Sequence, residues 1–203
     1  MYRVIALYKK PYNSEKPVVC MDEKSTQLLE DTRTSIPMKP GRVKRADHEY
    51  KRQGVRNIFV AVEPLAGTRF TKVTKRRTFG DTAYFFKKLA NRYPKAKKIQ
   101  LVLDNLNTHF EKSFTETFSY DEAKRILDKI NFIYTPSHGS WLNMAEIEIG
   151  ILQRQCLKKR MKDESALKDE VRHWQKPRNK SKSKIVWKFT RQDADKKLGK
   201  HYS

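Results

Sequence analysis

The stretches PVVCMD (17–22) and KIQLVLD (98–104) decide the fold, because each is a short apolar run that ends in an aspartate. Such runs are typical of strands buried on both faces of a sheet. If the two strands are parallel neighbours, Asp22 and Asp104 emerge at the same edge. Ligands of open α/β sheets bind at the carboxyl ends of the strands. The two runs therefore predict a site that contains both carboxylates.

The remaining pattern predicts a mixed α/β sheet flanked by helices. Strands are expected at 17–22, 57–64, 68–75, 98–104 and 131–134. Helices are expected at 81–92, 121–130, 142–156 and 165–175, the last with Ser165 as its cap. A strand-like piece and a short helix are expected after residue 184.

Two long segments show no clear period. Residues 23–56 are rich in proline, glycine and charge, and we expect a long loop, which in a compact domain is usually functional. Residues 176–184 (KPRNKSKSK) are expected to form a solvated linker.

The charge of the chain points to nucleic acid. With 45 Lys and Arg against 23 Asp and Glu, the formal net charge of the 203 residues is +22. A field of this strength attracts phosphate backbones. The clusters lie at 39–45, 72–77, 87–98, 154–162 and 176–184.

Composition also excludes several classes of protein. No apolar run approaches the roughly 20 residues that span a bilayer, and the first residues do not resemble a signal peptide. Cys20 and Cys156 have neither metal-binding spacing nor the pattern of a disulfide framework. We therefore expect a cytoplasmic protein with reduced thiols and no membrane partner.

A third acid from the helix after residue 142 can complete a set of hard oxygen ligands for Mg²⁺ or Mn²⁺. Two such ions about 4 Å apart can promote phosphodiester chemistry. Helical periodicity does not choose between Glu146 and Glu148, since each lies about 80° from the centre of the apolar face. Glu146 can also serve a capping box with Asn143 as the N-cap. The two aspartates can equally be turn or capping residues.

Three blocks, MDEKS (21–25), DNLNTH (104–109) and PSHGSWLNMAEIEIG (136–150), resemble the DDE transposases of bacterial insertion sequences, on the mariner-superfamily branch. The resemblance implies an RNase H-like fold with a mixed five-stranded sheet, two divalent ions, and cleavage and strand transfer of double-stranded DNA at transposon ends. Asp22 and Asp104 match the first two catalytic, metal-binding acids. The pattern L-N-x-x-E assigns the third to Glu146.

The resemblance also implies roles around the acids. Asn105 is expected to orient Asp104 or a bound water, and Asn143 to support the acids without binding metal. Glu148 is expected either to do the same or to lie on the surface. His109 is expected to be a structural loop residue. From its charge and length, segment 23–56 is expected to lie beside the site and to bind DNA. The loop before Glu146 is also expected to contact a base or phosphate of the DNA, although packing within this loop explains its residues at least as well. The residues are Lys39, Arg42, Lys44, Arg45, Lys51, Arg52, His138, Ser140 and Trp141.

The chain departs from the family pattern in two respects. The 41 residues between Asp104 and Glu146 are more than the mariner pattern has, and the excess is expected within 111–125. The 16 residues before the first strand leave no room for a helix-turn-helix module. We expect a residual linker (1–16), a catalytic domain (17–175) and a basic linker with a tail (176–203).

The leading hypothesis is therefore the catalytic half of a transposase, nucleoid-associated in a bacterium and a homodimer when active. A truncated remnant that only binds DNA is the alternative. A third hypothesis, an RNase H-like nuclease acting on RNA or hybrids, has little support in the sequence.

Overall fold

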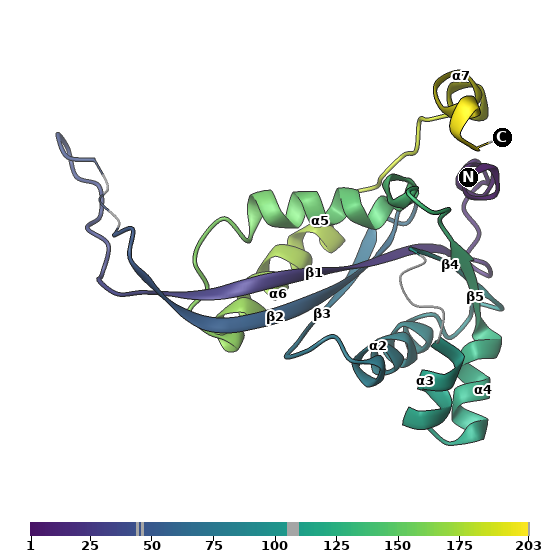
Figure 1. The fold of residues 1–203 in the computed structure, drawn as a ribbon, viewed down its shortest axis with the longest axis horizontal. Helices are drawn as coiled ribbons and strands as arrows, with labels where there is room; N and C mark the ends of the chain where they lie inside the picture. Colours follow the sequence, from purple (N-terminus) through teal and green to yellow (C-terminus); the bar gives the residue numbers. More distant parts are fainter. Residues whose placement is uncertain (44, 46, 105–109, 203) are drawn as a thin grey trace.

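The protein is built on a single five-stranded sheet with the strand order β3-β2-β1-β4-β5 (Figure 1). The computed structural model describes residues 1–43, 45, 47–104 and 110–202. The strands are β1 (Val18–Asp31), β2 (Tyr50–Glu63), β3 (Thr68–Thr74), β4 (Ile99–Leu103) and β5 (Ile130–Tyr134). The helices are α1 (Tyr2–Tyr8), α2 (Phe79–Arg92), α3 (Phe110–Thr117), α4 (Tyr120–Lys129), η1 (Ser140–Leu142, a 3₁₀ turn), α5 (Met144–Gln155), α6 (Glu164–Lys180) and α7 (Arg191–Tyr202).

The sheet is mixed, as predicted. β1 pairs with β4, and β4 with β5, in parallel. β1 pairs with β2, and β2 with β3, in the antiparallel sense. All five expected strands are present, and Gly67, with φ of +68°, lies in the turn between β2 and β3.

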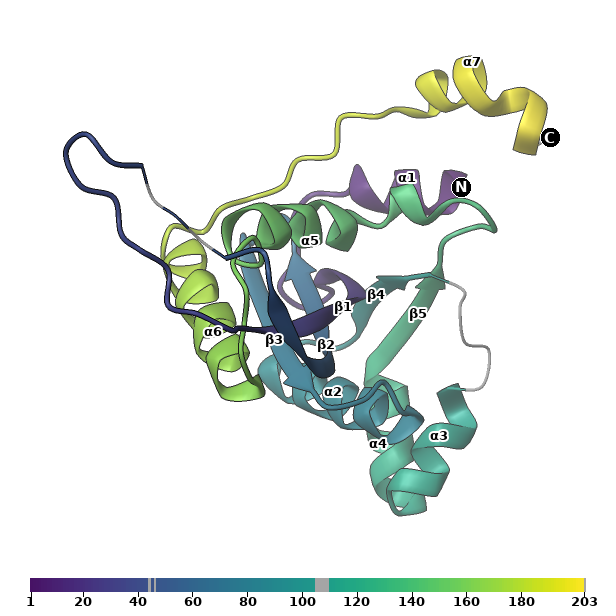
Figure 2. The same cartoon turned by 60° about the vertical axis from the view of Figure 1, so that its left-hand side comes forward.

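Helices cover both faces of the sheet (Figure 2). Val19 and Met21 of β1 point into one core cluster with α2, α3 and α4. Cys20 between them points into the opposite cluster, which contains the start of α5. Apolar side chains therefore alternate between two cores, which explains why the run 17–21 is apolar throughout.

The predicted helices are present, with small shifts at their ends. α2 begins two residues early because Thr78 caps it, in a capping box with Asp81. α3 was not predicted as a helix. α3 overlaps the segment 111–125, where the excess over the mariner pattern was expected, and its Phe114 is fully buried in the cluster around α2.

Residues 23–56 are not the expected long loop. β1 continues to Asp31 and β2 begins at Tyr50, so the two strands pair as an arm that projects from the sheet (Figure 1). Beyond them, the backbones of Lys39 and Arg42 exchange hydrogen bonds across Pro40-Gly41, and Gly41 has a φ of +75°. The arm carries no apolar alternation because most of its residues, including the whole of 50–55, are exposed.

Arg160 holds the root of this arm. Its Nη1 donates to the Asp31 carboxylate at 2.6 Å and to the Glu49 carbonyl at 3.1 Å, and its Nη2 donates to the His48 carbonyl at 3.1 Å. The guanidinium also lies 5.1 Å from the centre of the Tyr50 ring. One side chain therefore joins the end of β1 to the start of β2.

The chain ends also differ from the prediction. Residues 1–16 are not merely a linker, because α1 buries Val4 and Ile5 in the core. α6 is capped by Asp163 instead of Ser165 and continues to Lys180, so the expected linker is helical over 176–180. The strand-like piece after residue 184 forms no strand, and α7 follows it. None of the described helices is long and apolar enough to cross a membrane.

Substitution Arg160→Ala should loosen the arm, because four hydrogen bonds at its root are lost together. We expect faster amide hydrogen exchange in residues 29–31 and 50–52 and unchanged exchange in β4. Arg154→Ala, an exposed arginine on α5, is the matched control. Equal exchange in both variants would contradict this role.

Candidate active site

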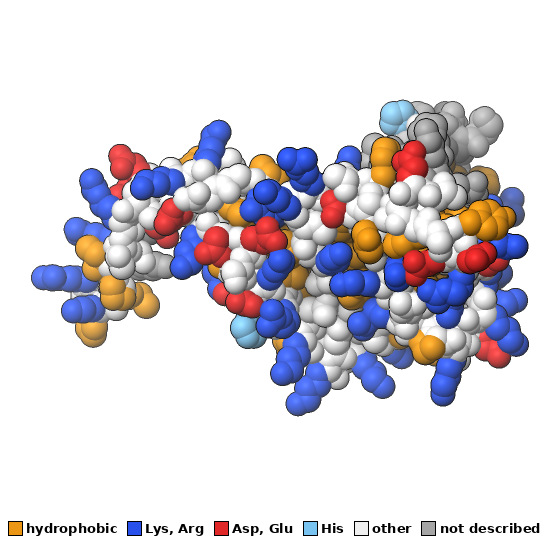
Figure 3. Space-filling model, turned by 90° about the horizontal axis from the view of Figure 1, so that it is seen from below, with side chains coloured by type: hydrophobic (Ala, Val, Ile, Leu, Met, Phe, Trp, Pro, Cys, Tyr) orange, Lys and Arg blue, Asp and Glu red, His pale blue; other side chains and the backbone are white. Residues whose placement is uncertain are grey.

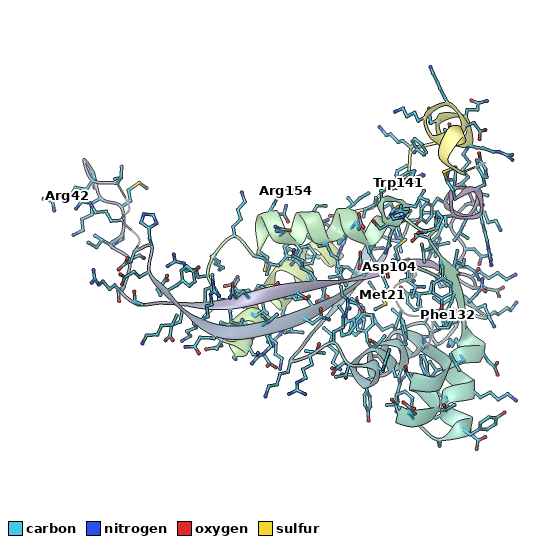
Figure 4. The ribbon with its side chains drawn as sticks, in the orientation of Figure 1. Met21, Arg42, Asp104, Phe132, Trp141 and Arg154 are labelled. Carbon is cyan, nitrogen blue, oxygen red and sulfur yellow. The ribbon has the colours of Figure 1, made fainter. Side chains whose placement is uncertain are left out.

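The site is located where β1 separates from β4. The parallel register pairs Val18 with Gln100 and ends at Cys20 with Val102. Asp22 and Asp104 each lie two residues beyond this last pair, at the same level of the sheet. Asp104 follows β4 directly, beside Met21 (Figure 4). Asp22 does not close its strand as predicted, because β1 continues into the arm while paired only with β2.

Three acids from three elements line one cavity of about 510 Å³. They are Asp22 of β1, Asp104 after β4 and Glu146 of α5. The rest of the wall comes from the loop after β5, with Thr135, Pro136, Ser137, His138 and Ser140. As placed in the described parts of the chain, no three acidic, histidine or cysteine side chains are grouped closely enough to hold one metal ion. The three carboxylates therefore line the same cavity, but they do not converge on one metal position.

Burial raises the pKa of Asp22 to about 7, and the negative charges of Asp104, Glu23 and Glu146 add to the effect. The backbone N–H of Glu23 donates to Asp22 at 2.7 Å and opposes this rise. A divalent cation bound beside Asp22 would offset the charge that its neighbours add there.

The raised pKa makes stability depend on pH. Since the folded pKa is about 7 and the usual value is 3.8, the folded state binds more protons than the unfolded state between these values. Stability therefore falls as pH rises from about 4 to 7. We expect Asp22→Asn, without divalent metal, to raise the melting temperature at pH 8, on the order of several degrees. Near pH 4 the gain should vanish; an equal gain at both pH values would contradict the assignment.

Asn143 ties the start of α5 to β1. Its side chain is buried, its Nδ2 donates to the Met21 carbonyl at 2.8 Å, and its Oδ1 accepts the Ala145 N–H at 3.1 Å. The predicted N-cap is confirmed. Because Met21 precedes Asp22 and Asn143 lies one turn before Glu146, this contact sets the distance between two of the acids.

Glu148 has a different environment from Glu146. Its side chain is fully buried and accepts two hydrogen bonds from each of two arginines. Arg69 of β3 donates at 2.9 and 3.2 Å, and Arg178 of α6 donates at 2.8 and 3.1 Å. Glu146, in contrast, is exposed at the cavity. Glu148 therefore joins β3, α5 and α6 and does not line the cavity.

Arg69 is the residue that sequence reasoning missed. Its side chain is fully buried and also donates to the carbonyls of Gly67 at 2.8 Å and Ser183 at 2.8 Å. Its backbone exchanges two hydrogen bonds with the Asn179 side chain. An arginine in a short strand of a very basic chain carries no signal that separates it from a surface cation.

Removing the charge of Glu148 should destabilise the fold, because two largely buried arginines would lose their counter-ion. We expect Glu148→Gln to lower the free energy of unfolding by about 3–5 kcal/mol, as measured by urea denaturation. Glu170→Gln, which breaks a more exposed pair with Lys159, should lower it by less than about 1 kcal/mol. Equal losses in the two variants would contradict the role of Glu148.

The loop that leads to α5 is held by aromatic residues from both ends of the chain. The Tyr8 hydroxyl donates to the Leu142 carbonyl at 2.8 Å and contacts the Cys20 sulfur at 3.3 Å. Trp187 packs against Tyr8 and against Trp141, with ring centres 5.3 and 6.2 Å apart. Trp141 therefore has the packing role that was its alternative, whereas His138 and Ser140 lie on the cavity wall.

The cations expected to bind DNA beside the site lie mostly on the arm. Lys39, Arg42 and Arg45 are exposed on its outer half, and Arg42 lies at the far end from Asp104 (Figure 4). Lys51 and Arg52 are exposed in β2. The expectation that segment 23–56 lies beside the site is wrong for the outer half, because strand pairing carries it away. Lys44, Asn105 and His109 lie outside the described residues.

Solved structures of the Mos1 mariner transposase resemble this fold. The paired-end complex with Mn aligns with a TM-score of 0.56 and 12% identity, over 89% of this chain and 56% of that one. The Mos1 strand transfer complex aligns with a TM-score of 0.57 and 14% identity, over 89% and 53%. The paired-end complex with Mg gives 0.53 and 16%, over 91% and 54%.

This chain thus spans about half the length of these relatives. The predicted RNase H-like fold, a mixed five-stranded sheet flanked by helices, is confirmed. No curated protein sequence matches the chain. The model of the family described as DDE superfamily endonuclease matches residues 17–168, three quarters of the chain. The chain belongs to this family of endonucleases.

Proposed function

We propose that this chain is the catalytic part of a DNA transposase of the mariner branch, which cleaves transposon ends and joins them to target DNA. One observation carries the proposal: Asp22, Asp104 and Glu146, from three separate elements, line one cavity in a protein of net charge +22. An acidic cavity in a strongly basic protein suits a reaction on a polyanion, since the surroundings attract phosphates and the carboxylates remain for a cation. Membership of the endonuclease family supports the same conclusion.

Asp22, Asp104 and Glu146 are the residues that would hold two Mg²⁺ or Mn²⁺ ions. Their donors are carboxylate oxygens, which these ions prefer. Burial raises the pKa of Asp22, and the charges of Asp104 and Glu146 add to that rise. The related Mos1 transposase is described in paired-end complexes with Mn and with Mg, which supports the choice of these ions. When bound, such ions promote attack on a phosphodiester and stabilise the leaving oxygen.

The chain's own residues would place the reacting groups. Asn143 holds the helix of Glu146 against the strand of Asp22, and Tyr8 supports the loop before it. His138 and Ser140, on the cavity wall, would contact the phosphate or a base next to the cleaved bond. Asn105 would orient Asp104. The cations of the arm would bind DNA away from the cavity.

The working assembly is proposed to be a homodimer on two DNA ends. The related Mos1 structures are named as paired-end complexes, and joining two ends to one target requires two active sites. An element of this kind in a bacterium would be an insertion sequence, and its transposase would act on the nucleoid. Recognition of the transposon ends would require more protein than the catalytic part.

A nicking assay on supercoiled plasmid with Mg²⁺ or Mn²⁺ tests the proposal. Wild-type protein should nick the plasmid, and Glu146→Gln should reduce the rate by at least about 100-fold, the scale for groups that stabilise transition-state charge. Glu170→Gln on α6 is the matched control and should nick like the wild type.

The outcomes separate the proposal from its alternative. Loss of nicking in Glu146→Gln alone supports a metal-dependent nuclease with this third acid. Nicking that survives in Glu146→Gln contradicts the assignment of this residue. Wild-type protein that binds DNA tightly and nicks under neither metal would favour the remnant that only binds DNA.

A further inference from the structure

The basic cluster at 72–77 (KVTKRR) has no role in the site described so far. It covers the end of β3 and the connection to α2, and Lys88 of α2 lies close enough to Lys72 to shift its pKa. We name Lys72, Lys75, Arg76, Arg77 and Lys88 the β3–α2 corner. Figure 1 shows this connection below the arm, and Figure 3 shows that basic side chains predominate over the middle of the lower face.

The corner is close to the catalytic edge of the sheet. The register pairs Glu23 of β1 with Phe59 of β2, and Phe59 with Lys72 of β3. Lys72 is therefore two strand spacings, about 10 Å, from the residue that follows Asp22. Arg77 reaches Glu23 directly, with Nη1 at 3.3 Å from the carboxylate. The corner therefore borders the strand that carries the first acid.

The positive charge of the corner is poorly compensated. Lys75, Arg76 and Lys88 are exposed, and within the described parts of the chain they and Lys72 form no ion pair. Burial lowers the pKa of Lys72, and the positive charges of Lys88 and Lys168 add to this, while the carboxylate of Asp81 opposes it. Like charges held this close repel one another, and a bound polyanion would remove the cost.

A groove of about 310 Å³ continues the corner along the edge of the sheet. Lys72 forms one wall, and Lys168 and Arg172 of α6 form the other. Both α6 cations already have an acidic neighbour on their own helix, Glu164 and Asp169. The unpaired positive charge is therefore on the β3–α2 corner. The groove adds a cation-lined surface next to it.

We propose that the β3–α2 corner binds the phosphodiester backbone of duplex DNA next to the segment that enters the acidic cavity. This inference rests on the proposed function, to which it adds a DNA-binding surface separate from the arm. Contacts from flexible lysines and arginines to phosphates position DNA and carry no sequence information, so the surface would accept any duplex sequence.

The test compares two variants with the same change of charge. The corner variant is Lys75→Ala/Arg76→Ala/Lys88→Ala, and the control is Lys9→Ala/Lys10→Ala/Lys16→Ala. All six side chains are exposed, and the control residues precede β1, away from its catalytic end. Binding of a labelled DNA duplex is measured without divalent metal over a range of salt concentrations, and plasmid nicking is measured in parallel.

Loss of three phosphate contacts should reduce the slope of log affinity against log salt by about 2 to 3 in the corner variant. The control should keep the wild-type slope. Equal slopes in the two variants, with wild-type binding and nicking intact, would overturn the corner and leave the proposed function standing. Wild-type protein that neither binds nor nicks DNA would overturn both.

Discussion

The parallel pairing of β1 with β4 is the constraint on which the site depends. It extends from Val18–Gln100 to Cys20–Val102 and stops there. Beyond that point β1 has a partner on one side only, which leaves room for a cavity between the separating backbones. Asp22 and Asp104 occupy the first positions whose side chains can face this space, and their mutual repulsion contributes to the raised pKa of Asp22. The same separation frees the end of β1 to continue with β2 as the arm.

The third acid depends on how α5 is held. Asn143 fixes the beginning of the helix to the Met21 carbonyl, and Glu148 fixes the next turn to Arg69 and Arg178. Burying the charges of Glu148, Arg69 and Arg178 costs free energy, and this cost is offset only when the charges are paired and hydrogen-bonded. Each arginine here makes two bonds to the carboxylate. With Glu148 held between α5, α6 and β3, Glu146 is directed to the cavity.

The core of the fold was predictable, and its exposed extensions were not. Buried strands such as β4 must be apolar, so an apolar run in the sequence predicts them. Helices are predicted by capping residues and by the period of their apolar positions. Leu28 is the one fully buried apolar residue among the described residues of the arm, where it packs in the cluster with α6, so the strands of the arm carry no regular apolar alternation. Spacing could not separate Glu146 from Glu148, because the difference between them is made by Arg69, a residue from a distant strand. Trp141 and Trp187 are also far apart in sequence, and only the fold shows that they pack together.

The central claim is that Asp22, Asp104 and Glu146 together hold divalent metal. Anomalous diffraction from crystals grown with Mn²⁺ tests it most directly, because the signal locates the metal independently of activity. We expect anomalous peaks in the cavity within coordination distance of all three carboxylates. Peaks bound by other residues, or a cavity without manganese while the protein is folded and the ion saturating, would contradict it.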